Sequence, residues 1–292
     1  DVYKRQYLYT SEKIDGPWKK QLIEGFYHDG SLLFDEDGRN YIVYGNDEIW
    51  ITELNEDLTA PKKDGLHRLL VSDHKNPELG YEGSHIQKIN GYYYIFLVHS
   101  LRDRWMRTEA CFYSDSLEGE FTGGDVLCDD RGYCGQGVAQ GGIVDTPDGK
   151  WYAMLFQDSG AVGRIPILVP VTWKDHFPFF GQNGHVPEEI EVHSTRPGYI
   201  YQPLVGSDDF CNGLLPRWQF NHDPDPRYYH LDALQGTYTI TTREVCTELT
   251  QAVNTLTQRM SYPSCAAEVT VDASALKEGD VCLLYTSDAA DE

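Results

Sequence analysis

Apolar and polar positions alternate in short runs along the first two hundred residues, and three of these runs share one pattern. In each, a polar residue precedes a short apolar stretch, an Asp-Gly or Asn-Gly pair follows, and an aromatic-rich stretch completes the unit. The three units span 29–44, 82–98 and 140–156. Asn-Gly and Asp-Gly pairs favour the positive φ values of a tight hairpin turn. The pattern therefore predicts three β-hairpins built on one repeat.

The spacing of the turn glycines indicates the kind of repeat. Gly38, Gly91 and Gly149 lie 53 and 58 residues apart. Propeller blades occupy about 40–50 residues, to which loop insertions add length. The sequences of 9–18 and 113–121 also resemble each other, and we expect both to be outer strands that close a blade. We therefore expect an all-β chain whose first part is a β-propeller.

One polar residue occupies the same place in each unit. Asp29, Glu82 and Gln140 each lie nine positions before the turn glycine. Equivalent positions in propeller blades are related by rotation about the central axis, so these three side chains should converge. A glycine follows each of them, which lets backbone and ligand approach closely. Asp29 and Glu82 could instead be ordinary solvated carboxylates at strand starts, but their shared offset favours a common site.

A second domain begins near residue 207, where the repeat ends. The stretches 236–242 and 266–272 alternate with a period of two, which is typical of a β-sandwich. We expect a partial catalytic propeller over 7–205 and a partial sandwich over 207–281.

Both ends of the chain resemble translated adapter sequence. Codons for residues 1–6 match the end of a sequencing-library transposon adapter, and residues 282–292 fit its reverse complement. We therefore interpret both ends as adapter-derived and expect a natural segment cut from a longer bacterial, metagenomic reading frame. On this interpretation the true N-terminus, any signal peptide, the compartment and the oligomeric state stay open.

The composition narrows the choice of ligand. The chain of 292 residues has a formal net charge of -22 and a pI of about 4.7, which disfavours nucleic acids and anionic membranes as partners. A neutral, polyhydroxylated ligand such as a sugar suits this charge, and the abundant Tyr and Trp side chains can stack on sugar rings. The seven cysteines are irregularly spaced and form no Cys-x-x-Cys pair, so we expect buried free thiols.

Five segments carry motifs of a known kind; in chain order they are 27–38, 81–94, 163–173, 218–224 and 254–259. Together these segments resemble glycoside hydrolase family 43, whose members are mainly β-xylosidases and α-L-arabinofuranosidases. The resemblance implies a five-bladed β-propeller, of which the N-terminal blade is missing, followed by a truncated concanavalin-like β-sandwich of the xylosidase branch. The expected substrates are xylo-oligosaccharides or xylan side chains.

The resemblance also implies roles for single residues. Glu82 matches the general acid, Asp29 matches the aspartate that orients this acid and modulates its pKa, and Arg164 is similar to the family's substrate-contacting arginine. An inverting glycosidase needs an acid and a base about 6.5–9.5 Å apart, and an ionised neighbour favours the protonated form of the acid. The family's general base has no match in this sequence, so we expect the fragment to be inactive.

Further candidates for substrate binding surround these groups. Gln140 takes the axial place of a histidine found in many family members, so no metal or other cofactor is required, although calcium is compatible with the site. The remaining candidates are aromatic or imidazole side chains: His28, His85, Tyr27, Trp105 and Phe156. Packing within strands is the competing interpretation for all of them. Arg102, Arg104 and Arg107 are expected on a surface loop, and 35–37 at a solvated hairpin tip.

Three functions remain in competition at this point. The first is an inverting exo-acting β-xylosidase, with α-L-arabinofuranosidase as the nearest alternative. The second is a sugar-binding propeller without catalysis. The third is a retaining glycosidase, which would hold its two carboxyl groups only about 5–5.5 Å apart.

Overall fold

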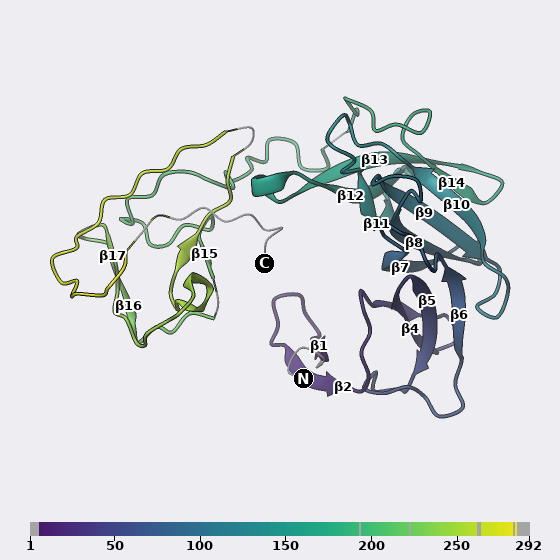
Figure 1. Ribbon diagram of the computed structural model, residues 1–292, viewed down its shortest axis with the longest axis horizontal. Helices are drawn as coiled ribbons and strands as arrows, with labels where there is room; N and C mark the ends of the chain where they lie inside the picture. Colours follow the sequence, from purple (N-terminus) through teal and green to yellow (C-terminus); the bar gives the residue numbers. More distant parts are fainter. Residues whose placement is uncertain (1–5, 193, 222, 262–263, 283, 285–292) are drawn as a thin grey trace. The chain divides into compact units, whose positions relative to one another are not determined.

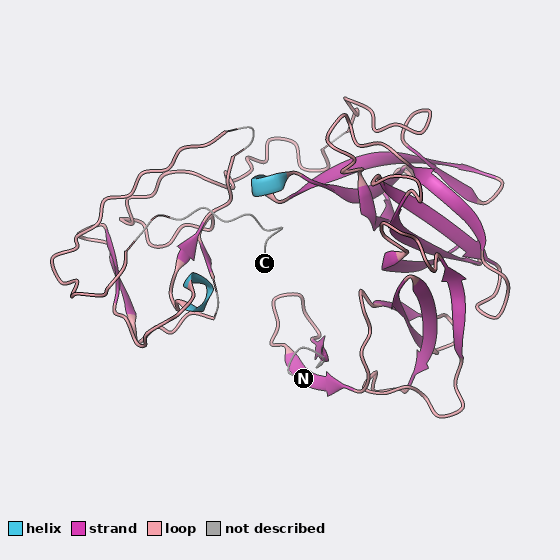
Figure 2. Cartoon of the chain, in the orientation of Figure 1, coloured by secondary structure: helices cyan, strands magenta, loops and turns pink. Residues whose placement is uncertain are grey.

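The computed structural model describes residues 6–192, 194–221, 223–261, 264–282 and 284. These residues form β-strands joined by loops, with two single-turn 3₁₀ helices, η2 (Gly160–Val162) and η3 (Leu249–Gln251) (Figure 2). The chain divides into two compact units, one made of Asp1–Ser159 with Arg164–Glu191 and the other of Gly160–Gly163 with Val192–Glu292. The prediction of an all-β chain is confirmed.

Three four-stranded antiparallel sheets make up most of the first unit (Figure 1). The first contains β3 (Ser31–Phe34), β4 (Asn40–Asn46), β5 (Glu48–Leu54) and β6 (His67–Ser72). The second contains β7 (Glu82–Ile89), β8 (Tyr92–Ser100), β9 (Arg107–Ser114) and β10 (Thr122–Leu127). The third contains β11 (Ala139–Asp145), β12 (Trp151–Asp158), β13 (Arg164–Lys174) and β14 (Phe177–Phe180). Each sheet follows chain order, as in a propeller blade, and a hairpin of β1 (Gln6–Thr10) and β2 (Lys19–Ile23) precedes them.

The predicted hairpin turns are present in all three sheets. Asn90 and Gly91 have φ values of 50° and 84° between the paired residues Ile89 and Tyr92, so they form the two-residue turn that Asn-Gly favours. Gly38 and Gly149 have φ values of 82° and 77° in the corresponding turns. The stretches 9–18 and 113–121, expected to be outer strands, are instead mainly turns: 9–18 joins β1 to β2, and 113–121 joins β9 to β10.

The core lies between the sheets, and β8 shows why. Ile95 and Leu97 pack into a cluster shared with the first sheet, whereas Tyr94 and Phe96 pack into a cluster shared with the third. Successive strand residues point to opposite faces, so a strand covered on both faces must be apolar throughout. All but the first of the β8 residues are buried, and 93–98 is correspondingly aromatic and aliphatic; the strand ends in the buried polar residues His99 and Ser100.

The hairpin tip at 35–37 differs in part from the prediction. Glu36 and Asp37 are exposed as expected, but Asp35 is buried at 7 % exposure. The Tyr93 hydroxyl donates to Asp35 Oδ2 (2.5 Å) and Lys88 Nζ donates to Asp35 Oδ1 (2.6 Å). Both donors come from the next sheet, so the sequence around the turn carries no sign of them.

The second unit contains two short strand pairs. β15 (Gln219–Phe220) pairs with β18 (Leu256–Thr257), and β16 (Tyr229–Asp232) pairs with β17 (Thr237–Ile240). The strand expected over 236–242 is therefore present, but the one expected over 266–272 is wrong, because these exposed residues find no pairing partner in the described part of the chain. Alternation alone does not make a strand unless a neighbour satisfies its backbone groups.

All seven cysteines are free, as expected, but only Cys111 is buried. Within the described ranges, no helix has the length and apolar character needed to cross a membrane.

Candidate active site

Two carboxylates from different sheets meet beside one histidine. Asp29 lies just before β3 with a φ of 47°, and Glu82 is the first residue of β7. His28 Nε2 lies 3.6 Å from Asp29 Oδ2 and 3.5 Å from Glu82 Oε2. The side chains of Asp29 and Glu82 are 38 % and 22 % exposed, so a ligand can reach both. The structure thus brings together two residues that lie 53 positions apart in the sequence.

Hydrogen bonds hold each carboxylate in place. The Asn46 side-chain amide at the end of β4 donates to Glu82 Oε2 (2.9 Å). The backbone N–H of Gly83 donates to Asp29 Oδ2 (3.2 Å), which links the residue after one carboxylate to the other carboxylate. Asn46 was not predicted as a site residue, because its only signal in the sequence is its position at the end of the strand that pairs with β3.

Gln140, the third residue at the shared repeat offset, packs against the same backbone. A Cβ atom added to Gly83 would lie 2.8 Å from Gln140 Cγ and Nε2, so only glycine fits here. Gln140 itself has a φ of 66°, and its backbone N–H donates to Glu109 Oε2 (2.6 Å). The three residues at the shared offset are therefore connected through Gly83.

Two buried charged residues that the sequence did not reveal, Arg107 and Glu109, both contact Gln140. Arg107 and Glu109 alternate along β9 and are 4 % and 0 % exposed, so the expectation that Arg107 lies on a surface loop is wrong. Burial raises the pKa of Glu109 well above its ordinary value, although the Gln140 N–H and the Arg107 charge act to lower it. Burial lowers the pKa of Arg107, although the charges of Asp158, Glu109 and Glu82 act to raise it. The period-two spacing of the two residues was a signal, but arginine is so rarely buried that a loop was the natural interpretation.

Arg164 reaches this region from β13. It lies directly across from Asp158 of β12, and its Nε atom is 3.3 Å from Asp158 Oδ1. The other oxygen, Asp158 Oδ2, lies 3.0 Å from Arg107 Nη1. The guanidinium carbons of both arginines lie 4.6 Å from the centroid of the Phe156 ring. Phe156, predicted as a ligand-stacking residue, therefore contacts two arginines, and Asp158 joins them.

The other candidate residues have different surroundings. His85 is exposed on β7 beside Gly142; the protein around its ring lowers the pKa of His85, and the Asp29 charge opposes this effect. Tyr27 is buried at 4 % exposure in an apolar cluster, where its ring meets Tyr44 edge-on. Trp105 is 40 % exposed in the loop before β9 and packs beside Gly135. The contacts of Tyr27 and Trp105 thus lie away from the carboxylates.

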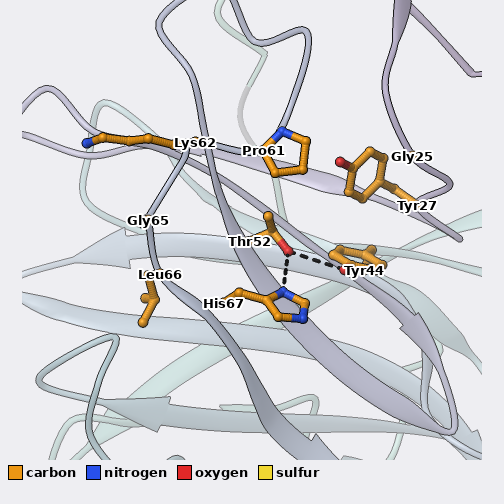
Figure 3. Close-up of a pocket in the computed structure, with 9 residues that line it drawn as sticks. All are labelled: Gly25, Tyr27, Tyr44, Thr52, Pro61, Lys62, Gly65, Leu66 and His67. Atoms are coloured by element: carbon orange, nitrogen blue, oxygen red, sulfur yellow. Dashed lines mark hydrogen bonds between the residues drawn. The ribbon is translucent and has the colours of Figure 1, made fainter.

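A pocket of about 340 Å³ opens on the first sheet (Figure 3). Its polar centre is Thr52, whose hydroxyl lies 3.2 Å from the Tyr44 hydroxyl and 2.9 Å from His67 Nδ1. Tyr44 and Thr52 occupy the face opposite to Val43 and Ile51, which pack into the core. Tyr27 is the one predicted site residue that lines this pocket, so the pocket does not mark the carboxylate site.

The carboxylate site could also offer ligands to a cation. One ligand atom from each of His28, Asp29 and Glu82 lies within 4.8 Å of the others. Calcium prefers six to eight oxygen ligands, which this group of two carboxylates and one imidazole does not supply. The set therefore fits proton transfer better than a calcium centre.

Comparison with known proteins places the chain in a family. The family model described as Glycosyl hydrolases family 43 matches residues 1–178, and that of the Beta xylosidase C-terminal Concanavalin A-like domain matches residues 207–285. The chain belongs to glycosyl hydrolase family 43, which accounts for the propeller blades and for the concanavalin-like second domain.

Individual relatives share between about a quarter and two fifths of their aligned residues with this chain. A "Beta-xylosidase" of Formosa agariphila is 26 % identical over 266 residues, which cover 78 % of this chain and 44 % of the relative. A "Xylosidase/arabinosidase 43B" of Humicola insolens is 26 % identical, covering 92 % of this chain and 53 % of the relative. A solved structure of a "Bifunctional GH43-CE" protein of Bacteroides eggerthii is 40 % identical with a TM-score of 0.75, covering 90 % of this chain and 34 % of that one. The chain spans about half the length of the curated relatives it matches.

Proposed function

We propose that this chain carries most of the active site of an inverting exo-glycosidase. The enzyme releases terminal xylose, or arabinofuranose, from xylo-oligosaccharides or xylan side chains. Glu82 is the general acid that protonates the glycosidic oxygen. Asp29 orients this end of β7, because its Oδ2 atom accepts the N–H of Gly83, the residue after Glu82. The observation that carries the proposal is the meeting of Asp29 and Glu82, both partly exposed, around His28 Nε2.

Arg164 and Gln140 bind the sugar in this proposal. Arg164 is exposed, and its guanidinium offers several N–H donors to hydroxyl groups. Gln140 can donate to or accept from a hydroxyl without titrating. The names of relatives divide between xylosidase and arabinosidase, so xylose is the first choice and arabinofuranose the second.

The general base is an aspartate outside the segments that match the family pattern. An inverting reaction needs this base to activate water on the opposite face of the sugar. We therefore expect the 292-residue chain to bind xylobiose without hydrolysing it. The relatives are about twice as long as their matching regions, which leaves room for a segment that carries the base.

The test compares two substrates in a protein extended upstream along the reading frame. General-acid catalysis contributes roughly 10²–10⁴-fold to such a reaction. Glu82→Gln should slow hydrolysis of xylobiose by about this factor but slow 2,4-dinitrophenyl β-xyloside far less, because dinitrophenolate leaves without protonation. Glu118→Gln, on an exposed turn, is the matched control and should change neither rate. Equal rates of Glu82→Gln and wild type on xylobiose would exclude Glu82 as the acid.

A non-catalytic sugar-binding propeller is the alternative. It predicts xylobiose binding in the extended protein without turnover. If the extended protein does hydrolyse xylobiose, NMR of the freshly released sugar distinguishes inversion from retention.

A further inference from the structure

Arg107 is a buried cation for which the proposed reaction has no role. Arg107 is 4 % exposed at the start of β9, where desolvation of its charge is costly unless partners compensate for it. The partners come from two other strands: Asp158 Oδ2 at 3.0 Å, the Phe156 ring at 4.6 Å, and Gln140 Oε1 at 3.4 Å. Because Arg107 contacts Asp158, Phe156 and Gln140 at once, it also restricts the positions of these three side chains.

Asp158 and Phe156 are shared with Arg164. Each oxygen of the Asp158 carboxylate pairs with one of the two arginines, and each guanidinium lies 4.6 Å from the same ring centroid. Asp158 and Phe156 lie two positions apart on β12, so they point to the same face. Asp158 thus offsets the charge repulsion between Arg107 and Arg164.

The orientation of the exposed Arg164 side chain depends on Asp158 and Phe156. The side chain of Arg164 is 64 % exposed, and within the described ranges its contacts go through Nε to Asp158 and through the guanidinium plane to Phe156. A long exposed side chain loses considerable rotamer entropy when it adopts one orientation. Asp158 and Phe156 select that orientation and leave the two Nη groups to face ligand.

We propose that Arg107 is a positioning residue: it fixes Asp158 and Phe156, and these fix Arg164 so that both of its Nη groups address neighbouring hydroxyls of the sugar. This inference rests on the proposed function in taking Arg164 as the sugar-contacting arginine. The planar guanidinium of Arg107 is required, because it pairs with a carboxylate, stacks on a ring and donates to an amide at once. A lysine keeps the charge but cannot make these three contacts together.

The first experiment measures Arg164 directly. In ¹H–¹⁵N spectra of the 292-residue chain, the Arg164 Nε–H signal is identified by its loss in Arg164→Lys. We expect this signal to be protected from exchange in the wild type and to lose its protection in Arg107→Lys and Asp158→Asn. Arg104→Lys, in the exposed loop before β9, is the matched control and should leave it unchanged. An Arg164 signal that stays protected in Arg107→Lys overturns the proposal.

The second experiment measures xylobiose binding by calorimetry. A hydrogen bond to a charged group contributes enough that its loss should weaken binding roughly tenfold in Arg107→Lys. In an Arg164→Ala background, Arg107→Lys should produce a much smaller loss, because Arg107 acts chiefly through Arg164 and retains only its contact with Gln140. Independent, additive losses would indicate a purely structural role and overturn the proposal. Loss of Arg164 protection without any change in xylobiose affinity would support the positioning of Arg164 and refute its role in sugar binding.

Discussion

Replacing Gly83 with alanine tests the close approach on which the site is built. Gly83 has a φ of 65°, and its N–H donates to Asp29 Oδ2. A Cβ atom at this position would lie 2.8 Å from both Cγ and Nε2 of Gln140. The Gln140 side chain must therefore move, which breaks its contact with Arg107. Every step of this displacement lies within the candidate active site.

The magnitude follows from two contributions. A left-handed conformation costs a non-glycine residue about 1–2 kcal/mol. Displacing Gln140 loses a hydrogen bond with a charged partner, so the total should be about 2–4 kcal/mol. In a unit of this size, 1 kcal/mol lowers the Tm by roughly 2–4 °C, so we expect a decrease of about 4–16 °C.

Gly91→Ala is the matched control. Gly91 also has a positive φ, 84°, but an added Cβ atom would meet nothing within 4 Å. This variant should lower the Tm by only about 2–8 °C, from backbone strain alone, and leave xylobiose affinity unchanged. Gly83→Ala should in addition weaken xylobiose binding in calorimetry. Equal Tm decreases and equal affinities for the two variants would refute the close packing of Gln140 on Gly83.

Three further predictions concern stability. Burial raises the pKa of Glu109 above its ordinary 4.5, so the wild type should lose stability relative to Glu109→Gln as the pH rises above about 4.5. Urea unfolding across pH measures this difference in stability, and a difference that stays constant with pH would contradict the prediction. Burial alone would raise the pKa of Asp35, but hydrogen bonds from Lys88 and Tyr93 outweigh it and lower the pKa below 3.8. Asp35→Asn should therefore cost roughly 1.5–3 kcal/mol at pH 7, and the difference from wild type should shrink in acid; a difference that persists at low pH would argue against the ion pair. Leu97→Ala, at a fully buried position between two sheets, should cost about 2–5 kcal/mol in the same assay, and a cost below about 1 kcal/mol would indicate loose packing there.

The sequence repeat by itself determined the hairpins and the grouping of the candidate carboxylates. Asp-Gly and Asn-Gly turns, with strands of period two on either side, define hairpins through local backbone preference alone. Because the repeat relates equivalent positions, it also predicted that Asp29, Glu82 and Gln140 lie close together. These are properties of short segments and their spacing, and a sequence displays both.

Tertiary structure alone decided which charged residues are buried. Asp35 lies in a turn whose composition suggests solvent, yet Lys88 and Tyr93 from the neighbouring sheet enclose it. Arg107 follows a loop rich in charged residues, yet Asp158 and Phe156 on β12 of the third sheet bury it. A charge is buried only when distant partners compensate for its desolvation, and no local pattern identifies partners 50 residues away. The sequence therefore located the candidate carboxylates, and only packing between the sheets revealed that Asp35 and Arg107 are buried.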